Sequence, residues 1–271
     1  MIIDIHKECL LAFNIWDINS AKAVIDAAAE WNKNVILQTS SSIYKQMDVK
    51  ETRAFIKSYA DRKKIKVYLH LDHCKDLNVI KDAISVKWDS VMIDASDLSL
   101  LENIQMTNQV IQMAHKENVL VEAEVGQIKG TEDTINIKEN RIASREDIKR
   151  FLMETEVDML AVAFGNAHGM YKGRLKLDYD LIDYVAQISN IPFVIHGGSG
   201  MGDEEIHKLS QIENVRKINI STEVKLAYRK GILLSLDNGL LEEEGFQASR
   251  VEESIYKAIY QMAFHKFKII I

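Results

Sequence analysis

Three histidines in this sequence, His73, His168 and His196, stand at or shortly after the end of a short apolar run. Three imidazole nitrogens from separate segments can hold a zinc ion and leave its remaining coordination position for water or substrate, as a catalytic zinc requires. A single histidine in such a place is more often an ordinary core or loop residue, because histidine is of intermediate burial. The three together reverse that balance and predict a catalytic metal site.

Asp72 directly precedes His73 in the sequence. A carboxylate next to a metal ligand can be placed close to a reacting bond and move a proton there. His70 belongs to the same apolar run, but the alternation of side chains along a strand should direct it differently from His73. The other histidines do not compete as ligands, because they fall on expected helices or termini, at positions 6, 115, 207 and 265.

A glycine-rich turn follows the third histidine, since residues 196–200 read His-Gly-Gly-Ser-Gly and a helix is expected to begin at Asp203. Glycines let successive N–H groups converge on an anion, and a helix start adds partial positive charge. An ordinary tight turn is the alternative explanation. Residues 219–222 follow the next apolar run and add amide and hydroxyl groups, so we expect this turn to bind the phosphate of a phosphorylated substrate.

The elements that must position these residues are strands alternating with helices. Apolar, β-branched runs recur at intervals of roughly 25 to 35 residues, and segments of helical period lie between them. Eight such units predict a (β/α)₈ TIM barrel. A doubly wound sheet is the alternative, but it usually has a glycine loop after its first strand, and residues 10–17 contain no glycine. The expected strands are 10–15, 35–39, 66–71, 90–93, 119–125, 159–164, 192–195 and 216–220.

The composition fits one such domain. The 271 residues exceed the roughly 250 that this barrel needs, and no linker divides them, so we expect a single domain over 1–271 with a C-terminal helical extension from about residue 240. A net charge of −6, without a basic stripe, argues against nucleic acid as a partner. No segment approaches a membrane span, and two cysteines are too few for a disulfide framework, so we expect no membrane partner and a cytoplasmic location.

The motifs together resemble the class II, zinc-dependent ketose-bisphosphate aldolases, which include fructose- and tagatose-bisphosphate aldolases. The resemblance runs from about residue 11 to about residue 229. It is carried by Ala-Phe-Asn at 12–14, Val-Ile-Leu-Gln-Thr-Ser at 35–40, His-Leu-Asp-His at 70–73, Val-Met-Ile-Asp at 91–94, Glu-Ala-Glu-Val-Gly at 122–126, Ala-His-Gly at 167–169, the turn at 196–200, and Asn-Ile-Ser-Thr at 219–222.

The resemblance implies that His73, His168 and His196 bind one catalytic zinc ion and that Asp72 exchanges a proton with the C4 hydroxyl of a ketose phosphate. Zinc would stabilise the carbanion left by C3–C4 cleavage as an enediolate. Glu132 would protonate that enediolate to give dihydroxyacetone phosphate. Residues Asn14, Gln38 and Ser40 would line the aldehyde side. The matches to the dihydroxyacetone-phosphate contacts are Gly169, Lys172, Gly197, Gly198, Ser199, Asn219, Ile220, Ser221 and Thr222.

Asp94 and Glu124 match acidic positions that in some members hold a second divalent or monovalent cation. Alternatively, they orient the ligand histidines by accepting hydrogen bonds from them, which is the role we favour. The family also implies carbohydrate metabolism such as glycolysis, and a homodimer or homotetramer.

Other functions remain open from the sequence. The chain could be a non-catalytic subunit that stabilises a related aldolase, although the complete set of site residues argues for chemistry. It could also be a TIM-barrel metallohydrolase, although residues 14–16 lack the His-x-His pair expected at the first strand. The aldehyde product is undetermined: glyceraldehyde 3-phosphate, malonate semialdehyde or another short aldehyde would each suit the same chemistry.

Overall fold

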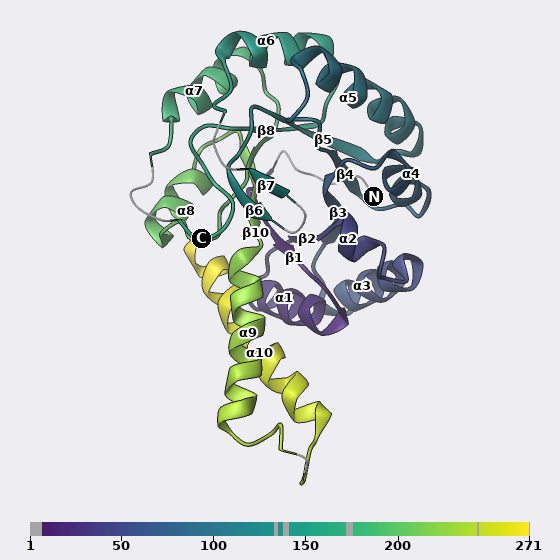
Figure 1. Cartoon of the computed structure of the whole chain (residues 1–271), viewed down its shortest axis with the longest axis vertical. Coiled ribbons are helices and arrows are strands. Elements are labelled where there is room, and N and C mark those ends of the chain that lie inside the picture. Colours follow the sequence, from purple (N-terminus) through teal and green to yellow (C-terminus); the bar gives the residue numbers. More distant parts are fainter. Residues whose placement is uncertain (1–6, 133–134, 138–140, 172–175, 243, 271) are drawn as a thin grey trace.

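The computed structural model describes residues 7–132, 135–137, 141–171, 176–242 and 244–270, with the backbone alone for 131–132 and 135–137. In these ranges eight parallel strands close into a barrel, in the order β1-β10-β9-β8-β5-β4-β3-β2 (Figure 1). The predicted TIM barrel is therefore confirmed. Its strands are β1 (Leu10–Asn14), β2 (Val35–Ser40), β3 (Val67–Cys74), β4 (Ser90–Ile93), β5 (Leu120–Val125), β8 (Met159–Val162), β9 (Phe193–Ile195) and β10 (Val215–Ile220).

Helices alternate with the strands and surround the barrel (Figure 1). Several begin where the sequence supplies a capping side chain: Asp17 and Ser20 form a reciprocal capping box at the first helix, and Ser99 and Glu102 form another. The helices are α1 (Ile18–Glu30), α2 (Ser41–Tyr44), α3 (Val49–Lys63), α4 (Leu77–Ser85), α5 (Leu100–Ala114), the 3₁₀ turn η1 (His115–Glu117), α6 (Arg145–Glu154), α7 (Tyr179–Ile188), α8 (Asp203–Ser210), α9 (Thr222–Asp237) and α10 (Ala248–Ile269).

Two short features were not predicted. One is α2, a single turn directly after β2. The other is an antiparallel hairpin of β6 (Gly130–Glu132) and β7 (Ile135–Ile137) in the connection that follows β5. Segments this short show no periodicity of their own, so hydrophobic patterning cannot reveal them.

The inside of the barrel changes character along the strands. Near the strand beginnings it is filled by an apolar cluster that includes Ile36, Tyr68 and Val194. Two residues further along, the same inward face carries His70 on β3 and Glu122 on β5, both fully buried. Because all strands are parallel, their carboxyl ends meet at one rim, where the chemistry of this fold is found.

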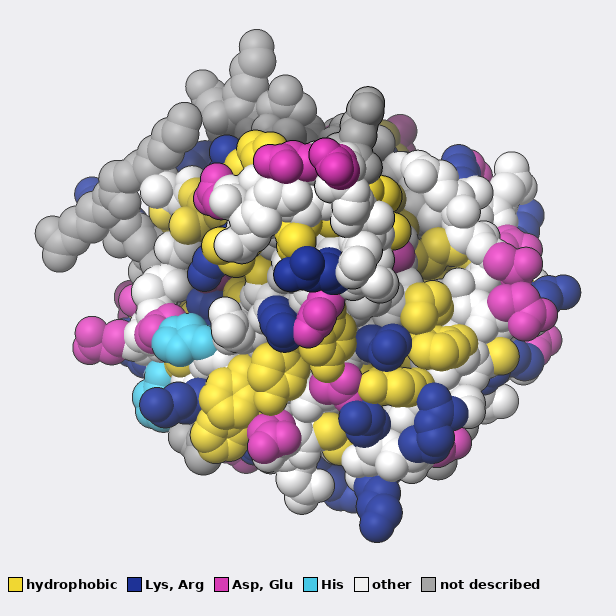
Figure 2. Space-filling view, turned by 90° about the horizontal axis from the view of Figure 1, so that it is seen from below, with side chains coloured by type: hydrophobic (Ala, Val, Ile, Leu, Met, Phe, Trp, Pro, Cys, Tyr) yellow, Lys and Arg dark blue, Asp and Glu magenta, His cyan; other side chains and the backbone are white. Residues whose placement is uncertain are grey.

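The helices α9 and α10 pack against each other as an antiparallel hairpin that extends beyond the barrel (Figure 1). Gly231 allows this packing, because a Cβ at this position would lie 2.4 Å from the Cα of Ile255. Figure 2 looks from below towards this end of the molecule, where apolar side chains lie among charged ones. The exposed apolar residues of α9 and its connection to α10 are Leu226, Ile232, Leu233, Leu234, Leu236, Leu241 and Phe246. No described helix has the length and apolar character to cross a membrane.

Replacing Gly231 by alanine should force α9 and α10 apart. We expect the free energy of unfolding to fall by about 1–3 kcal/mol, since the added methyl group meets backbone rather than a flexible side chain. Chemical denaturation of the variant and wild type measures this. Lys230→Ala, one residue earlier on the exposed face, is the control, and equal stability of both variants would show that the helices are not in close contact there.

Candidate metal and substrate site

An irregularity in β3 brings both Asp72 and His73 to the mouth of the barrel. Leu71 lies opposite Val91 and Cys74 opposite Ile93, so three steps along β3 match two along β4. His73 takes up the extra residue with a positive φ of 45°, a conformation that L-residues rarely adopt. Without this bulge, strand alternation would send neighbouring side chains to opposite faces. The bulge therefore lets adjacent residues share one site.

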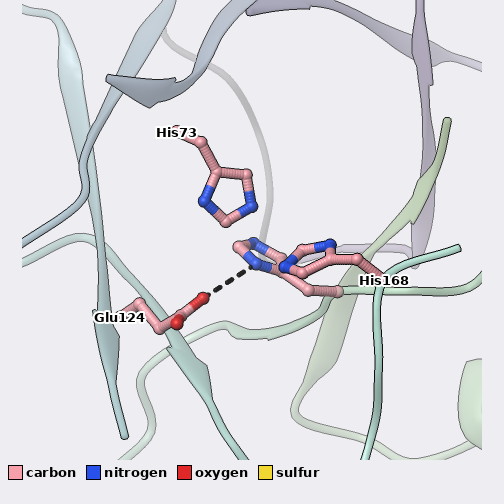
Figure 3. A group of neighbouring side chains, drawn as sticks. His73, Glu124 and His168 are labelled. Atoms are coloured by element: carbon pink, nitrogen blue, oxygen red, sulfur yellow. Dashed lines mark hydrogen bonds and ion pairs between the residues drawn. The ribbon is translucent and has the colours of Figure 1, made fainter. Parts of the chain in front are cut away.

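The three predicted histidines converge at the mouth. The ring centroid of His73 lies 5.0 Å from that of His168 and 4.6 Å from that of His196. The ring centroids of His168 and His196 are 5.9 Å apart. One ligand atom from each of these residues and from Glu124 falls within 4.8 Å of all the others (Figure 3). All four residues are buried, and we call this group of side chains, which are potential ligands, the metal cluster. The Nε2 atom of His73 is buried and has no hydrogen-bond partner among the described residues, as a ligand atom should be before metal binds.

Asp94 and Glu124 occupy different places around these rings. Asp94 Oδ2 lies 3.1 Å from Nδ1 of His73, on the side of the ring away from Nε2, and Ser96 also donates to the Asp94 carboxylate. Glu124 belongs to the cluster of potential ligand atoms, and its Oε2 lies 3.1 Å from His196 Nδ1. Asp94 is thus placed to orient a ligand, whereas Glu124 is placed to join the metal itself or to accept from His196.

The electrostatics of the cluster favour cations. Burial opposes a charged imidazolium, but the carboxylates of Asp72, Asp94 and Glu124 outweigh it and hold the pKa of His73 well above its ordinary value. Burial alone would raise the pKa of Asp94. The hydrogen bond from His73 and the attraction between the two charges have a larger, opposite effect, so the pKa of Asp94 is well below its usual range. A positive charge is therefore strongly stabilised at this mouth, which suits a divalent cation.

Strand alternation predicted that the His70 side chain points in a different direction from that of His73, but both face the inside of the barrel. The bulge at residues 72–73 changes the count along β3, so that His70 lies on the inside of the barrel too, one layer below the mouth. Its Nδ1 lies 2.8 Å from Ser90 Oγ, and its Nε2 is 3.5 Å from Glu122 Oε2. His70 is nevertheless outside the group of potential metal ligands among the described residues, as expected.

The Asp72 carboxylate is held by two amide side chains. Gln38 Nε2 donates to Oδ2 at 3.0 Å, and Asn219 Nδ2 donates to Oδ1 at 3.3 Å. Gln38 also donates to Asn14 Oδ1 at 2.9 Å, so residues from β1, β2, β3 and β10 meet here. Ser40, the remaining residue expected on this side, lies at the end of β2 with its hydroxyl 3.0 Å from that of Ser42.

The glycine turn after β9 needs its glycines for different reasons. Gly197 has a φ of 73°, and a Cβ there would lie 1.9 Å from the carbonyl oxygen of Ala167. A Cβ at Gly198 would lie 2.7 Å from the carbonyl oxygen of Asn219, which accepts the Gly198 N–H at 3.0 Å. These contacts allow the turn to lie directly against the loop that carries His168 and against the end of β10.

Ser199 and Ser221 meet at the start of α9. Ser199 Oγ accepts from the backbone N–H groups of Ser221 and Glu223, at 3.0 and 3.2 Å. The hydroxyl of Ser221 is buried and without a hydrogen-bond partner among the described residues, so it is available to a ligand. Ile220 is fully buried and Thr222 is the first residue of α9. Gly169, with a φ of 89°, has open space where a side chain would be. Substrate contacts by these residues stay predictions.

Two predicted residues lie wholly or partly outside the described part of the structure. Lys172 lies outside the described residues, and of Glu132 the backbone in β6 is described but not the side chain. The hairpin that carries Glu132 is tied to the metal cluster, since the backbone N–H of His168 donates to the Lys129 carbonyl at 2.8 Å. A Cβ at Gly130 would lie 2.3 Å from the His168 carbonyl oxygen, which makes glycine necessary at this contact.

Sequence reasoning overlooked a buried ion pair beneath the mouth. Lys217 Nζ lies 2.7 Å from Glu122 Oε2, and neither side chain is exposed. Glu122 Oε1 in turn lies 2.9 Å from His196 Nε2. A signal was present, because residues 122 and 124 are both glutamates on one face of an apolar strand, and Lys217 interrupts another apolar run.

The chain matches known proteins over most of its length. Residues 4–270 match the family model described as fructose-bisphosphate aldolase class-II. The sulfofructosephosphate aldolase of Alkalicoccus urumqiensis is 33% identical over 223 residues, which are 82% of this chain and 77% of that protein. The crystal structure of the YdjI aldolase from Escherichia coli K12 superposes with a TM-score of 0.82 at 26% identity, covering 100% of this chain and 97% of that one. A fructose-bisphosphate aldolase from Campylobacter jejuni gives 0.73 at 26% identity, covering 97% and 91%.

Proposed function

Because the chain belongs to the class II fructose-bisphosphate aldolase family and is a lyase, we propose that it is a zinc-dependent aldolase. It would reversibly cleave a ketose phosphate or bisphosphate into dihydroxyacetone phosphate and an aldehyde. The observation that carries this proposal is the group of buried ligand atoms from His73, His168, His196 and Glu124, all within 4.8 Å of one another, beside the carboxylate of Asp72. Three imidazoles with an additional carboxylate suit zinc.

The residues around the metal position divide the work. Zinc held by the three histidines would act as a Lewis acid on the ketose oxygen atoms and offset negative charge that develops next to the carbonyl. Asp72 would accept the proton of the C4 hydroxyl in cleavage and return it in condensation. Gln38 and Asn219 each donate to one oxygen of this carboxylate, which fixes the plane of the carboxylate. Both are neutral amides, so neither competes with Asp72 as a proton acceptor.

The phosphate of the dihydroxyacetone half would lie at the turn after β9. The unpartnered hydroxyl of Ser221 and the start of α9, a helix of 16 residues, offer a donor and a partial positive charge in the same place. Gly169, Gly197, Gly198, Ser199, Asn219, Ile220 and Thr222 complete the proposed contacts. Lys172 is proposed as a cation near the phosphate, and Glu132 as the acid that protonates the three-carbon fragment. Both come from the resemblance alone.

The aldehyde partner must be determined by assay. Asn14, Gln38 and Ser40 line the proposed aldehyde side. One relative is named a sulfofructosephosphate aldolase, which makes a sulfonated sugar phosphate a candidate substrate. A test panel should therefore contain fructose and tagatose bisphosphates together with a sulfonated ketose phosphate. A role in glycolysis and the cytoplasmic location stay predictions.

Removing the metal should abolish turnover. Dialysis against a chelator takes away the group that offsets the developing charge, and no lysine Schiff base is proposed to replace it, so we expect aldol cleavage to fall to background and to return with added zinc. Release of dihydroxyacetone phosphate from the substrate panel measures both steps. Full activity of protein shown to be free of metal would contradict the proposal.

Replacing Asp72 by asparagine should remove the proton acceptor and keep the fold. We expect kcat to fall by about 10²- to 10⁴-fold, which is the usual contribution of a general acid and base. Zinc content should be unchanged, because His73 keeps its partner Asp94. Asp97→Asn is the matched control, since this exposed carboxylate at the same rim pairs with Lys75. A variant at residue 72 with normal kcat would exclude the assigned role.

Self-association is proposed to involve the α9–α10 hairpin, as a homodimer or homotetramer. Leu236 and Phe246 on this hairpin are 58% and 54% exposed, and burying apolar surface of this kind drives association. We expect wild-type protein to sediment well above its chain mass of 30.9 kDa, and the variant Leu236→Glu with Phe246→Glu to sediment as a smaller species. Sedimentation velocity measures both. A monomeric wild type would rule out the assembly.

A further inference from the structure

A charged layer lies inside the barrel beneath the metal cluster. It contains Glu122 of β5, Lys217 of β10 and His70 of β3, none of which is exposed. Bulky branched apolar residues usually fill the interior of this fold. An ion pair in this position is costly to bury, and an apolar pair of similar volume would often be as stable or more so. Stability alone therefore does not explain why these charges are here.

The two oxygens of Glu122 have different partners. Oε2 lies 2.7 Å from Lys217 Nζ, and Oε1 lies 2.9 Å from Nε2 of His196. The other ring nitrogen of His196, Nδ1, faces Glu124 at 3.1 Å, on the side of the metal cluster. Glu122 thus contacts Nε2 of His196, and Nδ1 on the opposite edge of the ring faces the proposed metal position.

This arrangement decides which nitrogen of His196 can bind metal. A carboxylate only accepts hydrogen bonds, so Glu122 requires a proton on Nε2 and leaves Nδ1 as the ligand atom. A hydrogen-bonded carboxylate on the far nitrogen fixes both the tautomer and the ring orientation of a ligand histidine. For His73 the same task falls to Asp94, but with the nitrogens exchanged, since Asp94 accepts from Nδ1.

Lys217 holds the Glu122 carboxylate in place. Its ammonium lies 2.7 Å from Oε2, and both side chains are fully buried, so each charge is balanced by the other. His70 extends the same layer, with Nε2 at 3.5 Å from Glu122 Oε2 and 3.9 Å from Asp72 Oδ1. The layer therefore lies against both a metal ligand and the proposed proton acceptor.

We propose that Glu122 and Lys217 form a positioning pair that fixes His196 with Nδ1 towards the metal, so that zinc affinity depends on two residues that do not touch the ion. This inference rests on the proposed metal centre. It assigns a role to a lysine whose side chain is fully buried inside the barrel, and it requires no covalent or proton-transfer step by either residue.

The test compares two double variants with the wild type. Glu122→Leu with Lys217→Met removes both charges and the acceptor and leaves apolar side chains of similar size. Glu122→Gln with Lys217→Met removes both charges but keeps an amide oxygen that can accept from Nε2. Zinc affinity is measured by competition with a chromophoric chelator, and the absorption spectrum of the Co²⁺-loaded protein reports the ligand geometry. Thermal unfolding of the metal-free proteins reports their stability.

We expect zinc affinity to fall by about 10- to 100-fold in the leucine variant, the range found when such a partner of a ligand histidine is lost. The glutamine variant should lie between it and the wild type, and the Co²⁺ spectrum should change in the same order. The metal-free leucine variant should unfold at a temperature equal to or above that of the wild type. If it does not fold, the glutamine variant carries the same comparison.

A matched control separates positioning from general packing. Lys57 and Asp89 form another partly buried pair, with Nζ 2.6 Å from Oδ2, and their further hydrogen bonds are to the backbone of Val67 and Leu69. Lys57→Met with Asp89→Asn should change the unfolding temperature and keep wild-type zinc affinity. Folded double variants at 122 and 217 with wild-type affinity and Co²⁺ spectrum would overturn the positioning role alone. A wild-type protein that binds no zinc at His73, His168 and His196 would overturn the proposed metal centre as well.

Discussion

The rest of the site depends on one electrostatic constraint: several carboxylates and imidazoles are buried together at one end of a barrel. Asp72, Asp94 and Glu124 lie within reach of His73, and negative charge at this density is stable only when cations balance it. Raised pKa values of His73 and His196 are one expression of that balance. A divalent metal ion is the other, and the same field that holds protons on the rings of the metal-free protein would attract it.

The barrel meets this constraint by placing each acid against its own set of polar or charged groups. Asp94 accepts from one nitrogen of His73, and Glu122 accepts from one nitrogen of His196, while Lys217 balances the deeper carboxylate. Asp72 accepts hydrogen bonds from two neutral amides, those of Gln38 and Asn219. The carboxylates therefore serve different purposes because different elements of the barrel supply their partners.

Close backbone contacts hold the loops around this layer. The turn at Gly197 lies against the carbonyl oxygen of Ala167, and the hairpin at Gly130 lies against that of His168. A side chain at either position would push the His168 loop away from the other ligands. Ser199 joins the same turn to the start of α9, so the proposed phosphate site and the metal cluster share one framework.

The sequence by itself determined the succession of strands and helices, and hence the barrel, because eight apolar runs and their intervening helices each leave a local pattern. It also placed the histidines and Asp72 at one rim, since parallel strands bring their ends together. Only the tertiary structure decided the bulge at His73, the inward direction of His70 and the pairing of Glu122 with Lys217. These features depend on the register between strands and on partners far apart in the chain. A carboxylate or lysine within an apolar run does not reveal, from the local sequence pattern, which residue will balance its charge.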